Sequence, residues 1–225
     1  SGPGKTDSVG FELSPSVDYG FAGEQTSFNV GYAFTARYFD KQALGRNDKS
    51  DYTHTFNADF AHAFSPRVDM NANESFVIGQ EPDLLGNTAS TQPIDGDNIR
   101  NFAGVEFNIA ATRLVGFSLG YNNALYDYAA QFNSAYYDRM EHAVRVDSRW
   151  MLRPETTGIL GYTYLQNNYT ESGNLPASIV PVDSRDTRGH RFYVGAEQVF
   201  NPTLSGSLRA GLEVYDYVNI AGSSA

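Results

Sequence analysis

Apolar and polar side chains alternate along this chain over stretches of a dozen residues or more. Between 204 and 214, Leu208 and Leu212 occupy even positions, whereas Arg209 and Glu213 occupy odd ones. Successive side chains of a β-strand point to opposite faces, so this alternation predicts strands with one apolar and one polar face. The sequence contains no helical pattern of comparable strength. The alternation recurs at 9–21, 27–38 and 139–152.

Turn signals divide the chain into ten predicted strands. Pro66 and Pro202 suit the first corner of a tight turn, because the proline ring presets the backbone angle and no N–H is needed there. Short turns alternate with long loops rich in Asp, Asn, Gly and Ser, which predicts a repeat of hairpins. The predicted strands are 8–21, 26–39, 51–64, 68–80, 98–110, 114–127, 138–152, 156–169, 187–200 and 203–218. The short turns are AGEQ, SPR, ATR, RPE and NPT, and the long loops are 40–50, 81–97, 128–137 and 170–186.

The predicted strands are long enough to cross a membrane. Strands of soluble proteins usually have about 5 to 6 residues, whereas a transmembrane strand needs about 9 to 11. Long alternating strands with short turns at one end and long loops at the other are typical of outer-membrane barrels. The sequence therefore predicts an all-β fold, an antiparallel up-and-down transmembrane β-barrel, with residues 1–225 in a single domain. A soluble β-sandwich or solenoid is the less favoured alternative.

Aromatic residues gather near both ends of the predicted strands. Amphipathic rings prefer the membrane–water interface, so these residues predict two girdles, one at each interface. Tyrosines such as Tyr126 and Tyr217 crowd the long-loop ends. The predicted girdle at the short turns is lipid-facing and consists of Phe28, Phe64, Trp150 and Phe200.

The composition excludes several function classes. The 225 residues include no cysteine, so the chain can form neither a disulfide framework nor a thiol site. Acidic residues outnumber basic ones by 26 to 16, and the net charge of −10 argues against nucleic-acid binding. Only three of the basic residues are lysine, and a preference for arginine suits paired or confined positions.

Three segments resemble a known family: FELSPSVDY at 11–19, THTFNADFAHAFSPR at 53–67 and GHRFYVGAEQVFNPTLSGSLRAGLEVYDY at 189–217. They are similar to the β-barrel porin family of Gram-negative outer membranes, part of which is linked to exopolysaccharide gene clusters. The resemblance extends over nearly the whole chain and rests on hairpin and girdle patterns rather than on chemical motifs. It implies a barrel of about 16 to 18 strands, wide enough for an aqueous lumen.

Charged residues on the polar face of the predicted strands are the candidate site. One interpretation is a pore lining that selects permeating solutes. The other is a ladder of cross-strand ion pairs that stiffens the wall, and the near balance of positive and negative groups slightly favours it. Both can hold at once. The predicted pore-lining residues are Arg37, Asp59, Arg100, Glu106, Arg139, Glu141, Arg145, Asp147, Arg149, Arg191, Glu197, Arg209 and Glu213.

Three of these arginines share one face of a single predicted strand. Arg139, Arg145 and Arg149 could form a track for anionic solutes. Glu141 and Asp147 interrupt that track, so the sequence leaves anion selectivity open.

The sequence predicts no metal site, no cofactor and no enzymatic activity. A metal or catalytic site needs histidines that converge with carboxylates, and isolated histidines on an apolar face are more often structural. The paired Asp residues of IDGDN at 94–98 and VDSRD at 182–186 could bind Ca²⁺ or meet lipopolysaccharide through divalent cations, but solvated turns are favoured. No nucleophile has a base beside it. The histidines, all predicted to be structural, are His54, His62, His142 and His190.

The predicted function is passive: a porin-like channel for small hydrophilic solutes in the outer membrane of a Gram-negative bacterium. The alternative is a barrel that serves export or assembly, for instance of exopolysaccharide, or a scaffold without an open pore. Membrane lipid and lipopolysaccharide are the expected partners. A homo-oligomer or a surface partner protein remains an open alternative.

Two structural details are also predicted. Short turns of bacterial barrels face the periplasm, so both ends of this chain are expected outside the cell and the barrel is expected to be incomplete at both ends. The strand that begins near Val9 and the strand that ends near Tyr217 should then have unpaired edges. Strict alternation also turns Glu74 toward lipid, which predicts a bulge or a partner there.

Overall fold

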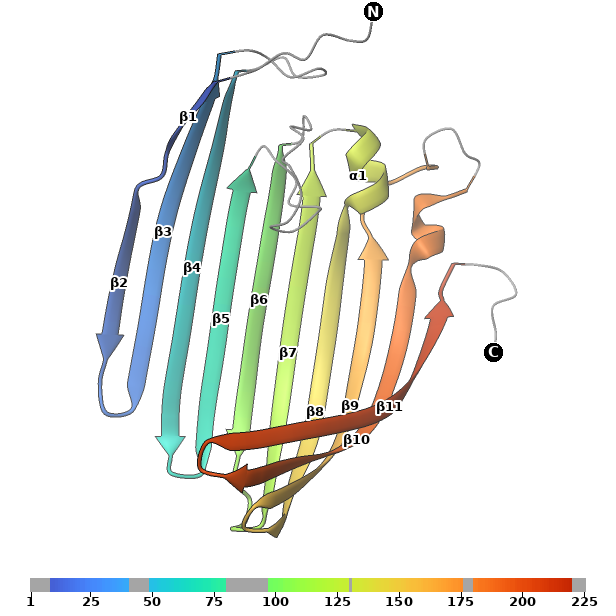
Figure 1. Ribbon diagram of the computed structural model, residues 1–225. Coiled ribbons are helices and arrows are strands. Elements are labelled where there is room, and N and C mark those ends of the chain that lie inside the picture. The colour runs from blue at the N-terminus through green and yellow to red at the C-terminus, as the bar shows by residue number, and fades with distance from the viewer. Residues whose placement is uncertain (1–8, 41–48, 80–96, 130, 176–179, 220–225) are drawn as a thin grey trace, which may run out of the picture.

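The computed structural model describes residues 9–40, 49–79, 97–129, 131–175 and 180–219, without the side chains of 131–133. The strands are β1 (Gly10–Leu13), β2 (Ser16–Ala22), β3 (Thr26–Phe39), β4 (Ser50–Ser65), β5 (Val68–Gly79), β6 (Asn98–Ile109), β7 (Val115–Tyr128), β8 (Arg139–Arg153), β9 (Thr156–Tyr169), β10 (Thr187–Asn201) and β11 (Leu204–Tyr217). The helices are α1 (Gln131–Tyr137) and the 3₁₀ helix η2 (Val182–Arg185). All strands belong to one antiparallel up-and-down sheet (Figure 1).

The predicted strands agree closely with the observed ones. Two of them, 26–39 and 156–169, match β3 and β9 at both ends, and all but the first of the others agree within one residue. This agreement has a local cause, because side-chain alternation and turn prolines act within a few residues of themselves. The first predicted strand, 8–21, is the exception, since the structure divides it into β1 and β2.

The division between β1 and β2 lies at Pro15. Both strands pair with β3 and keep the same register on the two sides of the break. The Pro15 carbonyl accepts a hydrogen bond from the Phe34 amide at 3.0 Å. Proline has no N–H to return that bond, so the ladder loses one hydrogen bond while the strand keeps its course.

The three turns that contain proline repeat one local structure. Two residues before each turn proline the register shifts, and the extra residue forms a β-bulge. A bulge bends the strand and increases its twist, which suits a hairpin at the rim of a curved sheet. The bulged residues and their prolines are Phe64 and Pro66, Leu152 and Pro154, and Phe200 and Pro202.

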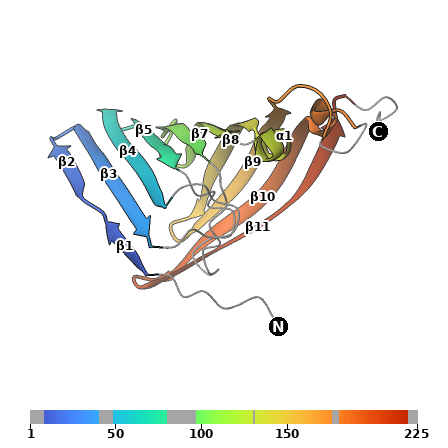
Figure 2. The same ribbon diagram turned by 90° about the horizontal axis from the view of Figure 1, so that it is seen from above.

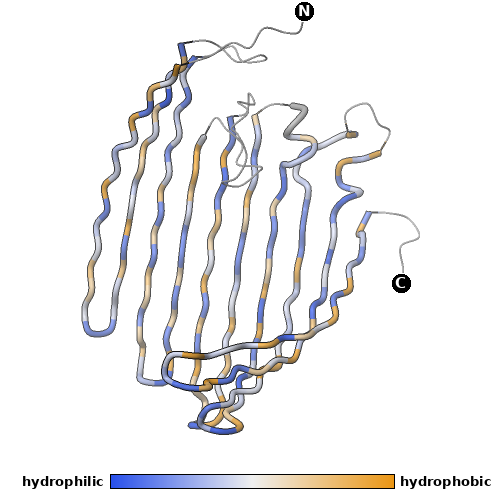
Figure 3. The backbone as a smooth tube through the Cα atoms, viewed as in Figure 1, coloured by the Kyte–Doolittle hydropathy of each residue, from blue (hydrophilic) through white to orange (hydrophobic). Residues whose placement is uncertain are grey.

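The two faces of the sheet differ in chemistry and in crowding. Ser118, Asp147 and Thr163 on the polar face are each 7% exposed, whereas Val146 and Leu160 on the apolar face are 44% and 58% exposed. Side chains crowd together on the inside of a curved sheet and spread apart on the outside. The polar face is therefore the concave one. Figure 2 shows the curvature, and Figure 3 shows hydropathy alternating along the strands.

Buried hydrophobic residues are few in the part of the chain that the structure describes. They are Tyr128, Ala135, Ile159 and Val182. A soluble sheet buries its apolar face against another layer, but here that face is the exposed convex surface. Among the described residues, no second layer packs on the apolar face of the sheet as it would in a β-sandwich.

The sheet is open in the described residues. β1 and β2 pair only with β3, and β11 pairs only with β10. The predicted absence of pairing between the first and last strands is therefore confirmed for these residues. Over the part of the chain that the structure describes, the strand order does not close into a ten-stranded barrel.

The helix α1 is not predicted by the sequence pattern, which indicates a loop at that position. The Tyr128 amide donates to the Asp138 carboxylate at 2.7 Å, just beyond the end of α1. Arg185 of η2 donates to the carbonyls of Ala135 at 2.6 Å and Tyr136 at 2.9 Å. Seven residues form too short a helix to show a period, and these tertiary contacts hold it in place. None of the described helices is long and apolar enough to cross a membrane.

Candidate functional site: the concave face

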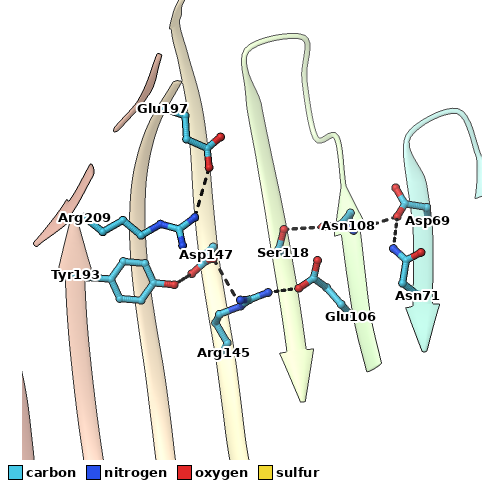
Figure 4. Close-up of polar contacts among 10 residues, drawn as sticks. All are labelled: Asp69, Asn71, Glu106, Asn108, Ser118, Arg145, Asp147, Tyr193, Glu197 and Arg209. Atoms are coloured by element: carbon cyan, nitrogen blue, oxygen red, sulfur yellow. Dashed lines mark hydrogen bonds and ion pairs between the residues drawn. The ribbon is translucent and has the colours of Figure 1, made fainter. Parts of the chain in front are cut away.

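Side-chain hydrogen bonds connect neighbouring strands across the concave face (Figure 4). On β5 to β7, the Asn108 amide donates to Asp69 at 3.0 Å and its carbonyl oxygen accepts from the Ser118 hydroxyl at 2.7 Å. The Asn71 amide also donates to Asp69, at 3.3 Å. These contacts tie three strands together through side chains as well as through the backbone ladder.

Arg145 on β8 is the centre of the next part of the network. Its guanidinium donates to Glu106 on β6, and its Nε lies 3.7 Å from the Asp147 carboxylate. The Tyr193 hydroxyl on β10 donates to Asp147 from the other side. Gly161 lies between them on β9, where a Cβ would collide with the Tyr193 ring and with Asp147. The missing side chain lets the network pass over that strand.

Glu197 on β10 joins two arginines from different strands. It accepts from Arg149 on β8 and, at 3.4 Å, from Arg209 on β11. Three further ion pairs lie on the same face: Arg191–Glu213 at 2.8 Å, Arg139–Glu141 at 2.6 Å and Arg37–Glu12 at 2.8 Å.

Most of the predicted pore-lining charges are thus brought into ion pairs. This geometry favours the ladder interpretation, while the role of these residues in lining a pore stays a prediction. Arg139, Arg145 and Arg149 each contact a carboxylate. In the described part of β8, these three arginines therefore do not form a row of unpaired positive charges that could guide anions. Of the two remaining predicted residues, Asp59 lines a separate hollow of about 480 Å³, and Arg100 lies on the concave face of β6 opposite Val77 and Tyr126.

The concave face also contains a hollow rich in amide side chains, which the sequence pattern does not predict. It has a volume of about 410 Å³ and is lined in part by Asn73, Asn122 and Asn167. The signal was present as asparagines at alternate positions, such as Asn71 and Asn73. The predicted site is defined by charged residues alone, so these asparagines are not included. They lie on different strands and come together only once those strands pair.

Glu74 lies on the convex face, as the alternation predicts. The register of β5 with β4 and β6 is regular at this position, so the predicted bulge is absent. The predicted partner is present, because the Asn101 amide on β6 donates to the Glu74 carboxylate.

The four histidines lie on the convex face and are held by hydroxyl groups. Three of them share one geometry. In each, a Tyr hydroxyl lies 2.8 Å from the Nδ1 of a His on the next strand of the sheet. The fourth, His62, is 2.7 Å from the Thr26 hydroxyl. These contacts fit the predicted structural role. The Tyr–His pairs are Tyr32–His54, Tyr121–His142 and Tyr162–His190.

The predicted girdle residues lie near the short-turn end. Phe28 stacks on Phe21 with ring centroids 5.5 Å apart. Phe64, Trp150 and Phe200 are exposed. Their contact with lipid stays a prediction.

The paired Asp residues of the long loops have structural contacts where they are described. Asp186 accepts hydrogen bonds from the Tyr169 amide at 2.7 Å and from the Asn219 side chain at 3.1 Å. Part of the other predicted motif, at 94–96, lies outside the described residues. Within the described ranges, no group of three or more His, Cys, Asp or Glu side chains is arranged to hold a metal ion.

Comparison with known proteins supports the fold. No family model and no curated protein matches the chain. Among solved structures, it is similar to a loop L8 deletion mutant of OmpT, an outer membrane protein of Vibrio cholerae, with a TM-score of 0.54 and 14% identity over 88% of this chain and 57% of that one. OccAB4 of Acinetobacter baumannii matches with a TM-score of 0.39 and 11% identity over 87% of this chain and 52% of that one. The chain spans little more than half the length of either structure. It is an all-β, antiparallel up-and-down sheet with the fold of a solved outer-membrane protein.

Proposed function

We propose that this protein forms the wall of an outer-membrane β-barrel through which small hydrophilic solutes diffuse passively into a Gram-negative bacterium. The observation that carries the proposal is the contrast between the two faces of one sheet. Leu208 and Leu212 on the convex face of β11 are each 77% exposed, while Arg209 and Glu213 on the concave face form ion pairs. Such a wall is stable where lipid covers one face and water fills the other.

Completion of the barrel is part of this proposal. In hydrocarbon, every backbone N–H and C=O must be satisfied, so open sheet edges are not tolerated there. The outer edges of β2 and β11 have no strand partner among the described residues. In the membrane, we expect strands beyond the described sheet to pair with these edges. Lipid and lipopolysaccharide would then cover the convex face.

Conductance in planar lipid bilayers tests the proposal. The intact protein, purified in detergent and added to one side, should produce stepwise currents in potassium chloride that scale with salt concentration. Liposomes that contain the protein should also swell when small sugars are supplied outside. A correctly folded protein that carries no current and admits no sugar would contradict the channel and favour the export or scaffold alternative.

A further inference from the structure

The amide-rich hollow differs in chemistry from the ion-pair network beside it. Its volume of about 410 Å³ lies over the concave face of β5 to β11. Glu141 is the one carboxylate in its lining, and Arg139 neutralises that group at 2.6 Å. Its lining includes the side chains of Asn73, Phe102, Asn122, Glu141, Asn167 and Tyr215.

Gly104 forms a bare patch of backbone between two of these amides. Asn73 and Asn122 lie on either side of it in register, on β5 and β7. A Cβ at position 104 would lie 2.5 Å from the Asn73 Oδ1 and 2.8 Å from the Asn122 Oδ1. The two amides therefore lean over the glycine, in space that any other residue would occupy.

Polar atoms of this lining are left over for a ligand. Neither Asn73 nor Asn122 has a side-chain partner among the described residues. The Oδ1 of Asn167 is buried without a hydrogen-bond partner. Buried polar groups are usually satisfied, so this oxygen is an acceptor that a water or a polar solute could use.

Aromatic rings supply the second half of the recognition surface. Phe102 is fixed by an edge-to-face contact with Tyr126, with ring centroids 5.5 Å apart. Tyr215 borders the same hollow and is 49% exposed. Amides that both donate and accept, beside apolar ring faces, complement a molecule that has hydroxyl groups and C–H faces.

We infer that this hollow is a binding subsite for neutral saccharides in transit through the lumen, an inference that rests on the proposed channel function. Charged solutes fit the hollow poorly, because its only carboxylate is already paired and a desolvated charge would meet no counter-charge. A neutral sugar can exchange its water for the free amide groups without that penalty.

Blocking of the open channel tests the inference. The intact protein in planar bilayers is titrated with maltotriose as the neutral probe and with glucuronate as a charged sugar. Maltotriose should reduce the current in a saturable way, and glucuronate should not. Gly104→Ala and Asn122→Ala should raise the half-blocking concentration of maltotriose by about five- to tenfold, the effect of losing one or two hydrogen bonds.

Asn57→Ala is the matched control. Asn57 is an exposed asparagine of the concave face on β4, outside the lining of the hollow, and its substitution should leave the block unchanged. Unchanged single-channel conductance without sugar would show that each variant is folded. A conducting channel without saturable maltotriose block, or with a block that Gly104→Ala and Asn122→Ala leave intact, would overturn the subsite and leave the channel standing. A protein without conductance would overturn both.

Discussion

On the concave face, single charges are compensated by specific neighbours. Glu197 accepts from Arg149 and Arg209, and Asp147 is placed between Arg145 and Tyr193. Partly exposed pairs of this kind contribute little stability each, but connected pairs restrict the motion of neighbouring strands. On the convex face the same charge would have no such environment. The effect of introducing a charge on the free energy of unfolding should therefore depend on which face of the sheet the substituted side chain occupies.

Leu208→Arg and Ser207→Arg test this dependence at adjacent positions. Leu208→Arg places a charge on the convex face, which lipid covers in the proposed barrel, and should lower the free energy of unfolding by about 2 to 4 kcal/mol near the bilayer midplane. Ser207 lies on the concave face opposite Glu197, so an arginine there should be tolerated. Reversible urea unfolding in lipid vesicles measures both variants. If both variants lost the same free energy of unfolding, the assignment of Leu208 to the convex face and Ser207 to the concave face would be wrong.

The pair of Glu74 and Asn101 provides a second test at the residue scale. Asn101→Leu leaves the Glu74 carboxylate without its partner on the convex face and should cost about 1 to 3 kcal/mol. Replacing both residues by leucine removes the two partly buried polar groups together and should cost less than the single substitution. A double-mutant cycle of unfolding free energies checks this order, and an additive result would refute the coupling.

At the scale of elements, the long-loop end is organised by α1 and η2. The Ser134 hydroxyl lies 2.6 Å from the Asp138 carboxylate and 2.7 Å from the Glu171 carboxylate. One hydroxyl hydrogen cannot be donated to two ionised carboxylates at once. Burial raises the pKa of Asp138 above its ordinary value, and the charges of Asp127 and Glu171 add to that rise. A proton shared in this cluster would satisfy the geometry.

The attachment of α1 should consequently weaken as pH rises. Because the pKa of Asp138 is raised in the folded state, folding favours the protonated form, and the stabilisation present in acid is lost as pH increases from the ordinary value of 3.8 through the raised value. Asp138→Asn should remove this dependence, since its amide can donate to Ser134 at any pH. Hydrogen exchange of the Tyr128 amide, corrected for the intrinsic rate, reports the change. Protection that grows with pH would be inconsistent with it.

At the scale of the whole molecule, one curved sheet separates two chemical environments. Most of the exposed apolar residues lie on its convex side, and the ion pairs lie on its concave side. The charges of the ion pairs on the concave face nearly cancel one another, so in the proposed channel these pairs should impose little preference for anions or cations. A preference for anions or for cations should appear when one charge of an ion pair is removed.

Glu197→Gln should shift the channel toward anions. The substitution leaves Arg149 and Arg209 without their shared carboxylate on the concave face. The reversal potential under a potassium chloride gradient should therefore move in the anion-selective direction. Gln198→Ala on the opposite face serves as the control and should leave the reversal potential unchanged. A shift of equal size in both variants would argue against the concave face as the conducting one.

The sequence alone determined the strands, their two faces and the turns. Alternation such as that of Leu208 and Arg209 is a property of consecutive residues, and Pro66 or Pro202 acts on its own turn, so both could be recognised without a tertiary structure. The residues of the charged face could be named for the same reason, and so could the exposed position of Glu74.

The tertiary structure decided which of these residues meet. Arg145 contacts Glu106, 39 residues earlier, and Asn73, Gly104 and Asn122 come together from three strands. Such contacts depend on strand register, and a shift of the register by one residue would abolish them. The position of α1 depends likewise on Arg185, about 50 residues away. Side-chain alternation is local and is therefore written in the sequence, whereas networks and hollows arise from pairings between distant strands and exist only once the sheet has formed.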